Sequence, residues 1–264
     1  NNLPDQPMTD FKVQIFFKDA EGAPADSHFF VKIATLTGTN AIDGTGVIQS
    51  SSAANIHWLI IPSSGTGGSS PAGQRYGVRA VISGVSAGAP QNVTTFDAFI
   101  TVHPQPLIKL EYALPYEVFG DEPLTEGPIE PIEPFPLAVR VTNIGFGTAN
   151  NFQIDSAQPK IIENKQGLQI DFKLLGTVVR GETIPNTLKI PFGDIAPSGV
   201  SQASWIMSTT LSGRFIEFTS TFTHAAELGG QLTSLMQSVT TYTLLRDVLV
   251  DLPGRDAIPD FLVN

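Results

Sequence analysis

The feature of this sequence that most constrains its fold is a two-residue alternation of apolar and polar side chains. Stretch 11–17 reads FKVQIFF, and stretch 137–142 reads LAVRVT. Successive side chains of a β-strand point to opposite faces of a sheet, so this period indicates strands with one buried face. Turns rich in Gly, Pro, Asp and Asn separate such stretches at short intervals. The pattern predicts an all-β protein.

Residues 227–239 are the exception. Leu228, Leu232, Leu235 and Val239 follow a helical spacing, which predicts a short helix there. The predicted strands are 11–17, 29–36, 54–61, 76–82, 93–102, 107–114, 137–142, 152–156, 168–174, 187–192, 203–207, 214–222 and 244–252.

The domain organisation follows from length and from one proline-rich break. A chain of 264 residues suggests two domains. The break is His103–Pro106, because proline cannot donate to a β-ladder. We therefore predict two tandem Ig-like β-sandwich domains, 1–106 and 107–264, the second with a C-terminal extension over 224–264. The final residues look like a linker, which suggests a piece of a longer protein.

An acidic, proline-rich connector over residues 115–136 is the segment with the most chemical interest. It has no Lys or Arg, and its repeat PIEPIEP (128–134) favours polyproline II geometry. Calcium is bound by six to eight oxygens, which closely spaced carboxylates can supply. Asp121, Glu122 and Glu126 are the candidate cation ligands. The other interpretation is a solvated linker, since no EF-hand pattern is present.

Composition removes several function classes. The chain has no cysteine, which excludes disulfides, thiolate nucleophiles and cysteine-bound metal clusters. It has 25 acids against 15 bases, and the bases look scattered, so nucleic acid is not expected as a partner. No apolar run is long enough to predict membrane insertion.

Motifs that could support catalysis or binding have simpler interpretations. Gly84–Gly88 (GVSAG) matches the nucleophile-elbow pattern, but a loop rather than a helix is expected to follow Ser86. The four histidines are not spaced as metal ligands. The aromatics, including Phe96, Phe99, Trp205, Phe215, Phe218 and Phe222, are expected to fill the core, with an exposed platform for a sugar as the alternative.

The stretch VRVTNIGFGTAN (139–150) resembles the opening of CARDB-type Ig-like modules of bacterial surface proteins. The alternating valines form a strand, Asn143 can bond to nearby backbone, and Gly145 and Gly147 tolerate turn conformations. Other stretches, such as FGDIAP (192–197), are similar to segments of very long bacterial secreted proteins with Ig-like or Rhs/YD repeats. The resemblance implies spacer, adhesion or assembly roles and supplies no catalytic residues.

These observations predict a non-enzymatic structural or adhesive module, secreted or at the bacterial cell surface. Its expected partners are neighbouring domains of a longer chain, other copies of itself, or a surface glycan or protein. The alternative is a calcium- or carbohydrate-binding accessory module, for which Ca²⁺ would be the cofactor; the main prediction requires none. A hydrolase using Ser86 is the third hypothesis.

Overall fold

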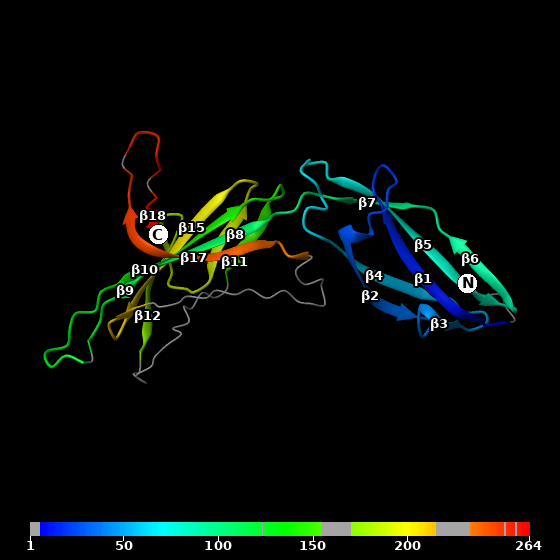
Figure 1. The fold of residues 1–264 in the computed structure, drawn as a ribbon, viewed down its shortest axis with the longest axis horizontal. Helices are drawn as coiled ribbons and strands as arrows, with labels where there is room; N and C mark the ends of the chain where they lie inside the picture. Colours follow the sequence, from blue (N-terminus) through cyan, green and yellow to red (C-terminus); the bar gives the residue numbers. More distant parts are fainter. Residues whose placement is uncertain (1–5, 123, 155–169, 215–232, 251, 257) are drawn as a thin grey trace. The chain divides into compact units, whose positions relative to one another are not determined.

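The computed structural model describes residues 6–122, 124–154, 170–214, 233–250, 252–256 and 258–264. The described residues are almost entirely β-structure, as predicted, with one 3₁₀ turn at Asp26–His28. They form two compact units: the first has the residues up to Gln105 together with 233–235, and the second has the other described residues from Pro106 onward (Figure 1). Among the described residues, no helix combines the length and apolarity needed to cross a membrane.

The first unit consists of two sheets that enclose an apolar layer. A five-stranded sheet has the order β3-β1-β5-β6, with β7 also paired to β5, and β2 pairs with β4 in a second sheet. The strands are β1 (Met8–Lys18), β2 (Phe29–Thr37), β3 (Asp43–Ile48), β4 (Asn55–Pro62), β5 (Gln74–Ser86), β6 (Ala89–Thr94) and β7 (Ala98–Val102).

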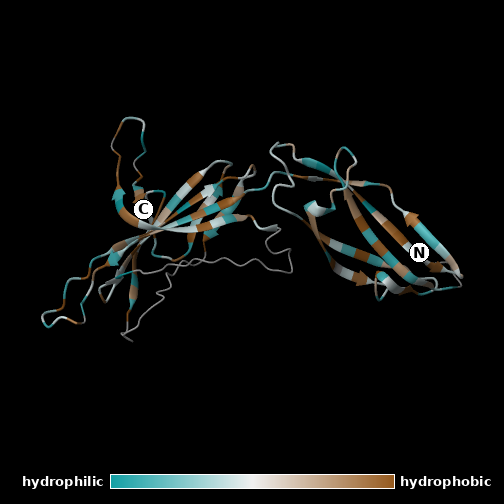
Figure 2. Ribbon diagram, viewed as in Figure 1, coloured by the Kyte–Doolittle hydropathy of each residue, from teal (hydrophilic) through white to brown (hydrophobic). Residues whose placement is uncertain are grey.

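Alternation along these strands decides what is buried in the first unit. Phe17 of β1 stacks on Phe29 of β2 with ring centroids 4.2 Å apart, and Phe29 meets Tyr76 of β5 edge to face. A neighbouring cluster joins Phe11 and Val13 to Trp58 of β4. Figure 2 shows the pattern as alternating hydrophobic and hydrophilic bands along the strands. The five-stranded sheet therefore has one face in the core and one outer face.

The predicted strand 93–102 is interrupted. Residues 95–97 connect β6 to β7, and both short strands pair with the long strand β5. At the interruption, Thr95 satisfies the backbone of Ala80 in β5. The Thr95 N–H donates to the Ala80 carbonyl at 2.9 Å, and the Ala80 N–H donates to the Thr95 hydroxyl at 2.9 Å.

The second unit is built on a seven-stranded sheet of order β13-β12-β15-β10-β8-β17-β18. The pair β11-β14 covers one face of it, because Phe192 and Ile190 pack with Trp205 and Val139 in one core. The strands are β8 (Ile108–Pro115), β9 (Glu117–Val118), β10 (Phe135–Asn143), β11 (Ala149–Ile154), β12 (Phe172–Val179), β13 (Glu182–Ile184), β14 (Ile190–Ile195), β15 (Val200–Thr209), β16 (Gly213–Arg214), β17 (Met236–Val248) and β18 (Asp260–Val263).

The helix predicted near residues 227–239 is wrong where the structure describes it. Met236–Val239 begins β17, which runs parallel to β8 with Val239 opposite Leu110. The β-branched residues that follow favour a strand, and pairing to β8 satisfies the backbone. Residues 227–232 lie outside the described residues, as do 215–222 of the predicted strand 214–222. The predicted extension 224–264 thus supplies two strands of the main sheet.

Candidate functional site

The acidic segment, residues 115–136, forms the long connection from the end of β8 to the start of β10. Its start pairs with β16, and the Ser212 hydroxyl accepts from the Gly120 N–H at 2.9 Å and donates to the Gly120 carbonyl at 2.7 Å. The Glu133 N–H donates to the Phe119 carbonyl at 3.1 Å, which joins the two ends of this connection. The segment is therefore held both by hydrogen bonds within it and by bonds to residues 212–214.

Two of the three predicted cation ligands serve this hydrogen-bond network. Asp121 Oδ1 accepts from the Glu130 N–H at 3.4 Å, and Glu122 Oε1 accepts from the Leu124 N–H at 3.4 Å. Glu126 is exposed and is not joined to them by these bonds. Over the described part of the chain, no group of three or more His, Asp or Glu side chains is arranged to hold a metal ion. Calcium binding here stays a prediction.

Glu130, which the sequence did not single out, is the central carboxylate of the segment. It accepts from the Glu122 N–H at 2.9 Å and from the Thr125 hydroxyl at 3.0 Å. The Glu122 N–H bond, followed by the Thr125 bond, lowers the pKa of Glu130. Donors aimed at a carboxylate favour its charged form, so Glu130 keeps its charge in mild acid.

The GVSAG motif lies in a β-hairpin. Ser86 ends β5 and Ala89 starts β6, with Ala87 and Gly88 both at positive φ (52° and 75°) between them. That is the geometry of a two-residue hairpin turn. A nucleophile elbow needs a strand-to-helix turn, and the turn here leads into a strand.

The outer face of the five-stranded sheet in the first unit carries a concentration of positive charge and aromatic rings. By the alternation that buries Phe11, Val13 and Phe17, the even-numbered residues of β1 face outward, and so do the odd-numbered ones of β5 and β7. Phe16 lies directly opposite Arg79, and Lys18 opposite Gly77. We call this surface the basic–aromatic face; it consists of Lys12, Phe16, Lys18, Arg75, Arg79 and Phe99.

Phe99 is fixed in place on this face although 59% of it is exposed. The Arg75 guanidinium lies 3.9 Å from the centre of its ring. The ring edge lies close to the backbone at Gly77, where an added Cβ would be in ordinary van der Waals contact with it at 3.6 Å. A cation over an aromatic face is attracted by the ring electrons. The pair forms a flat surface with both apolar and positive character.

Phe96 lies at the rim of the basic–aromatic face and is 97% exposed, although its backbone is clamped on both sides. Thr95 is bonded to Ala80 as described above. Asp97 forms a bidentate ion pair with Arg79, at 2.8 Å to Nε and 3.0 Å to the second nitrogen. The hydrogen bond from Arg79 lowers the pKa of Asp97. Nearly the whole Phe96 ring is exposed to solvent, so its apolar area is available to a partner.

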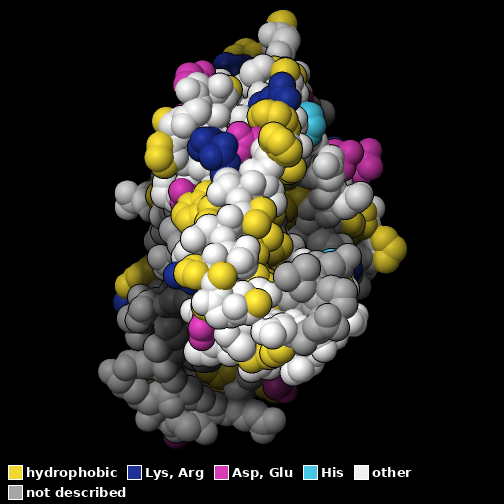
Figure 3. All heavy atoms as spheres, turned by 90° about the vertical axis from the view of Figure 1, so that its right-hand side faces the viewer, with side chains coloured by type: hydrophobic (Ala, Val, Ile, Leu, Met, Phe, Trp, Pro, Cys, Tyr) yellow, Lys and Arg dark blue, Asp and Glu magenta, His cyan; other side chains and the backbone are white. Residues whose placement is uncertain are grey.

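Charge is unevenly placed within the first unit. Its basic residues are Lys12, Lys18, Lys32, Arg75 and Arg79, and four of these five lie on the basic–aromatic face. Two carboxylates oppose these cations: Asp97, which is paired with Arg79, and Asp43 of β3, whose position lies opposite Lys12. Figure 3 looks at one end of the first unit, where hydrophobic and Lys or Arg side chains adjoin at the surface. A chain of net charge −10 thus presents a locally positive, aromatic surface.

Sequence reasoning treated these bases as scattered and missed the face. The sequence feature that could have revealed the face is that the basic residues of each strand are all odd-numbered or all even-numbered, which places them on one side of the sheet. Lys12 and Lys18 are both even-numbered on β1, and Arg75 and Arg79 are both odd-numbered on β5. Of the aromatics considered for a sugar platform, Phe96 and Phe99 are exposed and Trp205 is buried in the core. Phe215, Phe218 and Phe222 lie outside the described residues.

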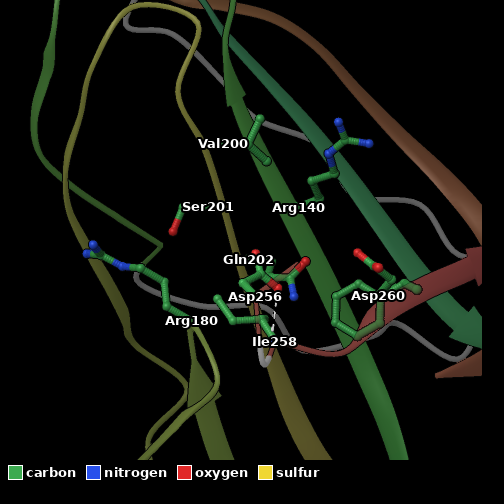
Figure 4. A pocket seen from close by; sticks show the side chains of 9 residues that line it. Arg140, Arg180, Val200, Ser201, Gln202, Asp256, Ile258 and Asp260 are labelled. Atoms are coloured by element: carbon green, nitrogen blue, oxygen red, sulfur yellow. Dashed lines mark hydrogen bonds between the residues drawn. The ribbon is translucent and has the colours of Figure 1, made fainter. Parts of the chain in front are cut away.

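The second unit has a cavity of about 410 Å³ on its seven-stranded sheet (Figure 4). The chain before β18 crosses the sheet, and the Gln202 side chain donates to the Pro259 carbonyl at 2.7 Å. Among the described residues, the buried Ser201 hydroxyl has no hydrogen-bond partner. The lining of the cavity has two arginines and two aspartates, so the charge of the cavity selects neither anions nor cations. The lining residues are Arg140, Arg180, Val200, Ser201, Gln202, Asp256, Ile258, Asp260 and Phe261.

Comparison with known proteins gives no relative from which a function could be transferred. No protein-family model, no curated protein and no solved structure matches the chain.

Proposed function

We propose that this chain is a non-enzymatic structural or adhesive module of a bacterial extracellular or cell-surface protein, and that it makes contact through the basic–aromatic face. Its domains, in this proposal, are Ig-like sandwiches that act as rigid spacers or assembly units. The CARDB-like stretch at 139–150 supports the location, and the all-β fold supports the spacer role.

The observation that carries the proposal is the pair of exposed aromatic rings beside the cations. Phe96 and Phe99 offer apolar area, and Arg75 and Lys18 offer charge. Ring burial supplies affinity, while opposite charge steers the encounter and sets specificity. The surface therefore suits an acidic partner that also has apolar groups.

The test uses a polyanion, because the whole chain is acidic. A protein of net charge −10 is expected to be repelled by poly-L-glutamate unless a local surface attracts it. We expect immobilised full-length chain to bind poly-L-glutamate at low salt and to release it as salt screens the charges. Poly-L-glutamate binding should weaken about tenfold or more in the variant Arg75→Glu/Phe99→Ala.

Lys32→Glu is the matched control, since Lys32 is exposed on β2, in the other sheet of the same unit. It changes the net charge by the same amount as Arg75→Glu and should leave binding nearly unchanged. Absence of binding by the unmodified chain, or an equal loss in the control, would contradict the proposal.

A second candidate function is a carbohydrate-binding accessory module, which the same exposed rings favour, because sugars stack on aromatic faces. A glycan array distinguishes the two: a neutral glycan bound by the unmodified chain and lost with Phe96→Ala supports this candidate. Its calcium-dependent form predicts that added Ca²⁺ raises the melting temperature, and that Glu122→Gln reduces the shift.

A further inference from the structure

The acidic segment has the surface chemistry that the basic–aromatic face lacks. It contains six acids and no base, and several of its apolar side chains project into water. Ile129 is 80% exposed and Leu124 is 73% exposed. Exposed apolar groups of this size on a well-held segment are typical of an interaction surface.

The repeat within the segment separates its residue types by face. In PIEPIEP (128–134), proline, isoleucine and glutamate each recur at every third position. Residues 129–134 belong to no strand or turn. A polyproline II helix has three residues per turn, so in that geometry Ile129 and Ile132 share one face and Glu130 and Glu133 share another. Such helices dock on surfaces lined by aromatic rings, with little ordering cost.

Taken together, these features complement the basic–aromatic face in both charge and apolar character. We propose that the acidic segment of one copy docks on the basic–aromatic face of a second copy. Ile129 and Ile132 pack against Phe96 and Phe99, and the exposed carboxylate of Glu133 faces Arg75 and the two lysines of β1, while Glu130 keeps its bonds within the segment. This inference rests on the proposed function, since it names the partner of that same face.

The docked surfaces differ, and this determines the assembly. One surface belongs to the second unit and the other to the first. After one contact, one copy therefore still has a free basic–aromatic face and the other a free acidic segment, so the pair keeps one free surface of each kind. Contacts between unlike surfaces form rings when the rotation closes and open filaments when it does not. The proposal therefore predicts growth beyond a dimer.

Two full-length variants separate the surfaces. Phe96→Ser/Phe99→Ser removes the rings and keeps the acidic segment. Ile129→Ser/Ile132→Ser removes the isoleucines and keeps the face. All four side chains are exposed, so folding should be unaffected, which circular dichroism and the melting temperature check. The measured quantity is mass by multi-angle light scattering across a concentration series, at low and high salt.

We expect the unmodified chain to gain mass with concentration and to lose it at high salt. Each variant alone should stay monomeric. An equimolar mixture of the two should reach twice the monomer mass and grow no further, because only one complementary pair of surfaces remains.

Three outcomes would overturn the inference: a monomeric unmodified chain, two variants that still assemble singly, or a mixture that stays monomeric. An unmodified chain that remains monomeric but binds poly-L-glutamate would refute self-docking while leaving the proposed function standing. An unmodified chain that neither gains mass with concentration nor binds poly-L-glutamate would refute both self-docking and the proposed function.

Discussion

Asn143 ties three segments of the second unit together, and its replacement by alanine should cost a large share of that unit's stability. The side chain is fully buried. Its Oδ1 accepts from the N–H groups of Leu107 at 3.1 Å and Gly145 at 3.0 Å. Its Nδ2 donates to the carbonyls of Gly147 at 2.8 Å and Ile195 at 2.9 Å.

The magnitude follows from the groups left behind. Asn143→Ala leaves the buried Gly145 N–H and the partly buried Leu107 N–H without an acceptor, and a buried unpaired donor costs about 1–3 kcal/mol. The carbonyls lose less, because a carbonyl oxygen has a second lone pair. We expect the unfolding free energy of the second unit to fall by about 3–5 kcal/mol.

The assay is urea unfolding followed by tryptophan fluorescence. The chain has two tryptophans, Trp58 in the first unit and buried Trp205 in the second, so a Trp58→Phe background reports on the second unit alone. The control is Thr142→Val, because the Thr142 hydroxyl is buried without a hydrogen-bond partner among the described residues. It should leave stability unchanged or raise it. A loss below about 1 kcal/mol for Asn143→Ala would refute the reasoning.

Three further predictions concern packing, backbone space and pH. Phe192→Ala empties a fully buried site and should lower the unfolding free energy of the second unit by about 3–5 kcal/mol in the same assay. Gly46→Ala places a Cβ 2.0 Å from the Ala41 carbonyl oxygen, so the first unit should melt at a lower temperature, measured by Trp58 fluorescence in a Trp205→Phe background. The folded pKa of Asp97 is lowered by Arg79, so the stabilisation is present above its unfolded value of about 3.9 and lost as pH falls through the folded value. Acid titration from pH 6 to 2 should therefore reduce the stability of the unmodified first unit more than that of Asp97→Asn; parallel curves would show that the ion pair contributes nothing.

Strand content could be predicted from sequence because burial on one face of a sheet enforces a two-residue period. The interruption at 95–97 could not, since Thr95 and Asp97 there bond to Ala80 and Arg79 of β5, which are neighbours only in the folded sheet. The error at Met236–Val239 has a similar origin. The apolar spacing there fits a helix, but the pairing to β8, more than a hundred residues earlier, decides the outcome. Long-range pairing overrides local pattern.

Of the two candidate surfaces, one could be predicted from the sequence and the other could not. The acidic segment could be found because its charge and prolines are contiguous. The basic–aromatic face could not be found by composition, because its residues come from three strands that are adjacent only in the folded sheet. Asn143 was recognised as a turn residue, whereas its bonds to Leu107 and Ile195 depend on the tertiary fold.

The most direct test of the contact through the basic–aromatic face is site-specific cross-linking, which is clean because the chain has no cysteine. Thr101→Cys places a thiol on the outer face of β7, on the same side as Phe99. Gly127→Cys places one in the acidic segment, where a Cβ meets open space. Mixed and oxidised, the two variants should give mainly heterodimers joined between residues 101 and 127, with the yield falling as salt is raised. Equal amounts of homodimers and heterodimers, or a yield that salt leaves unchanged, would contradict the account.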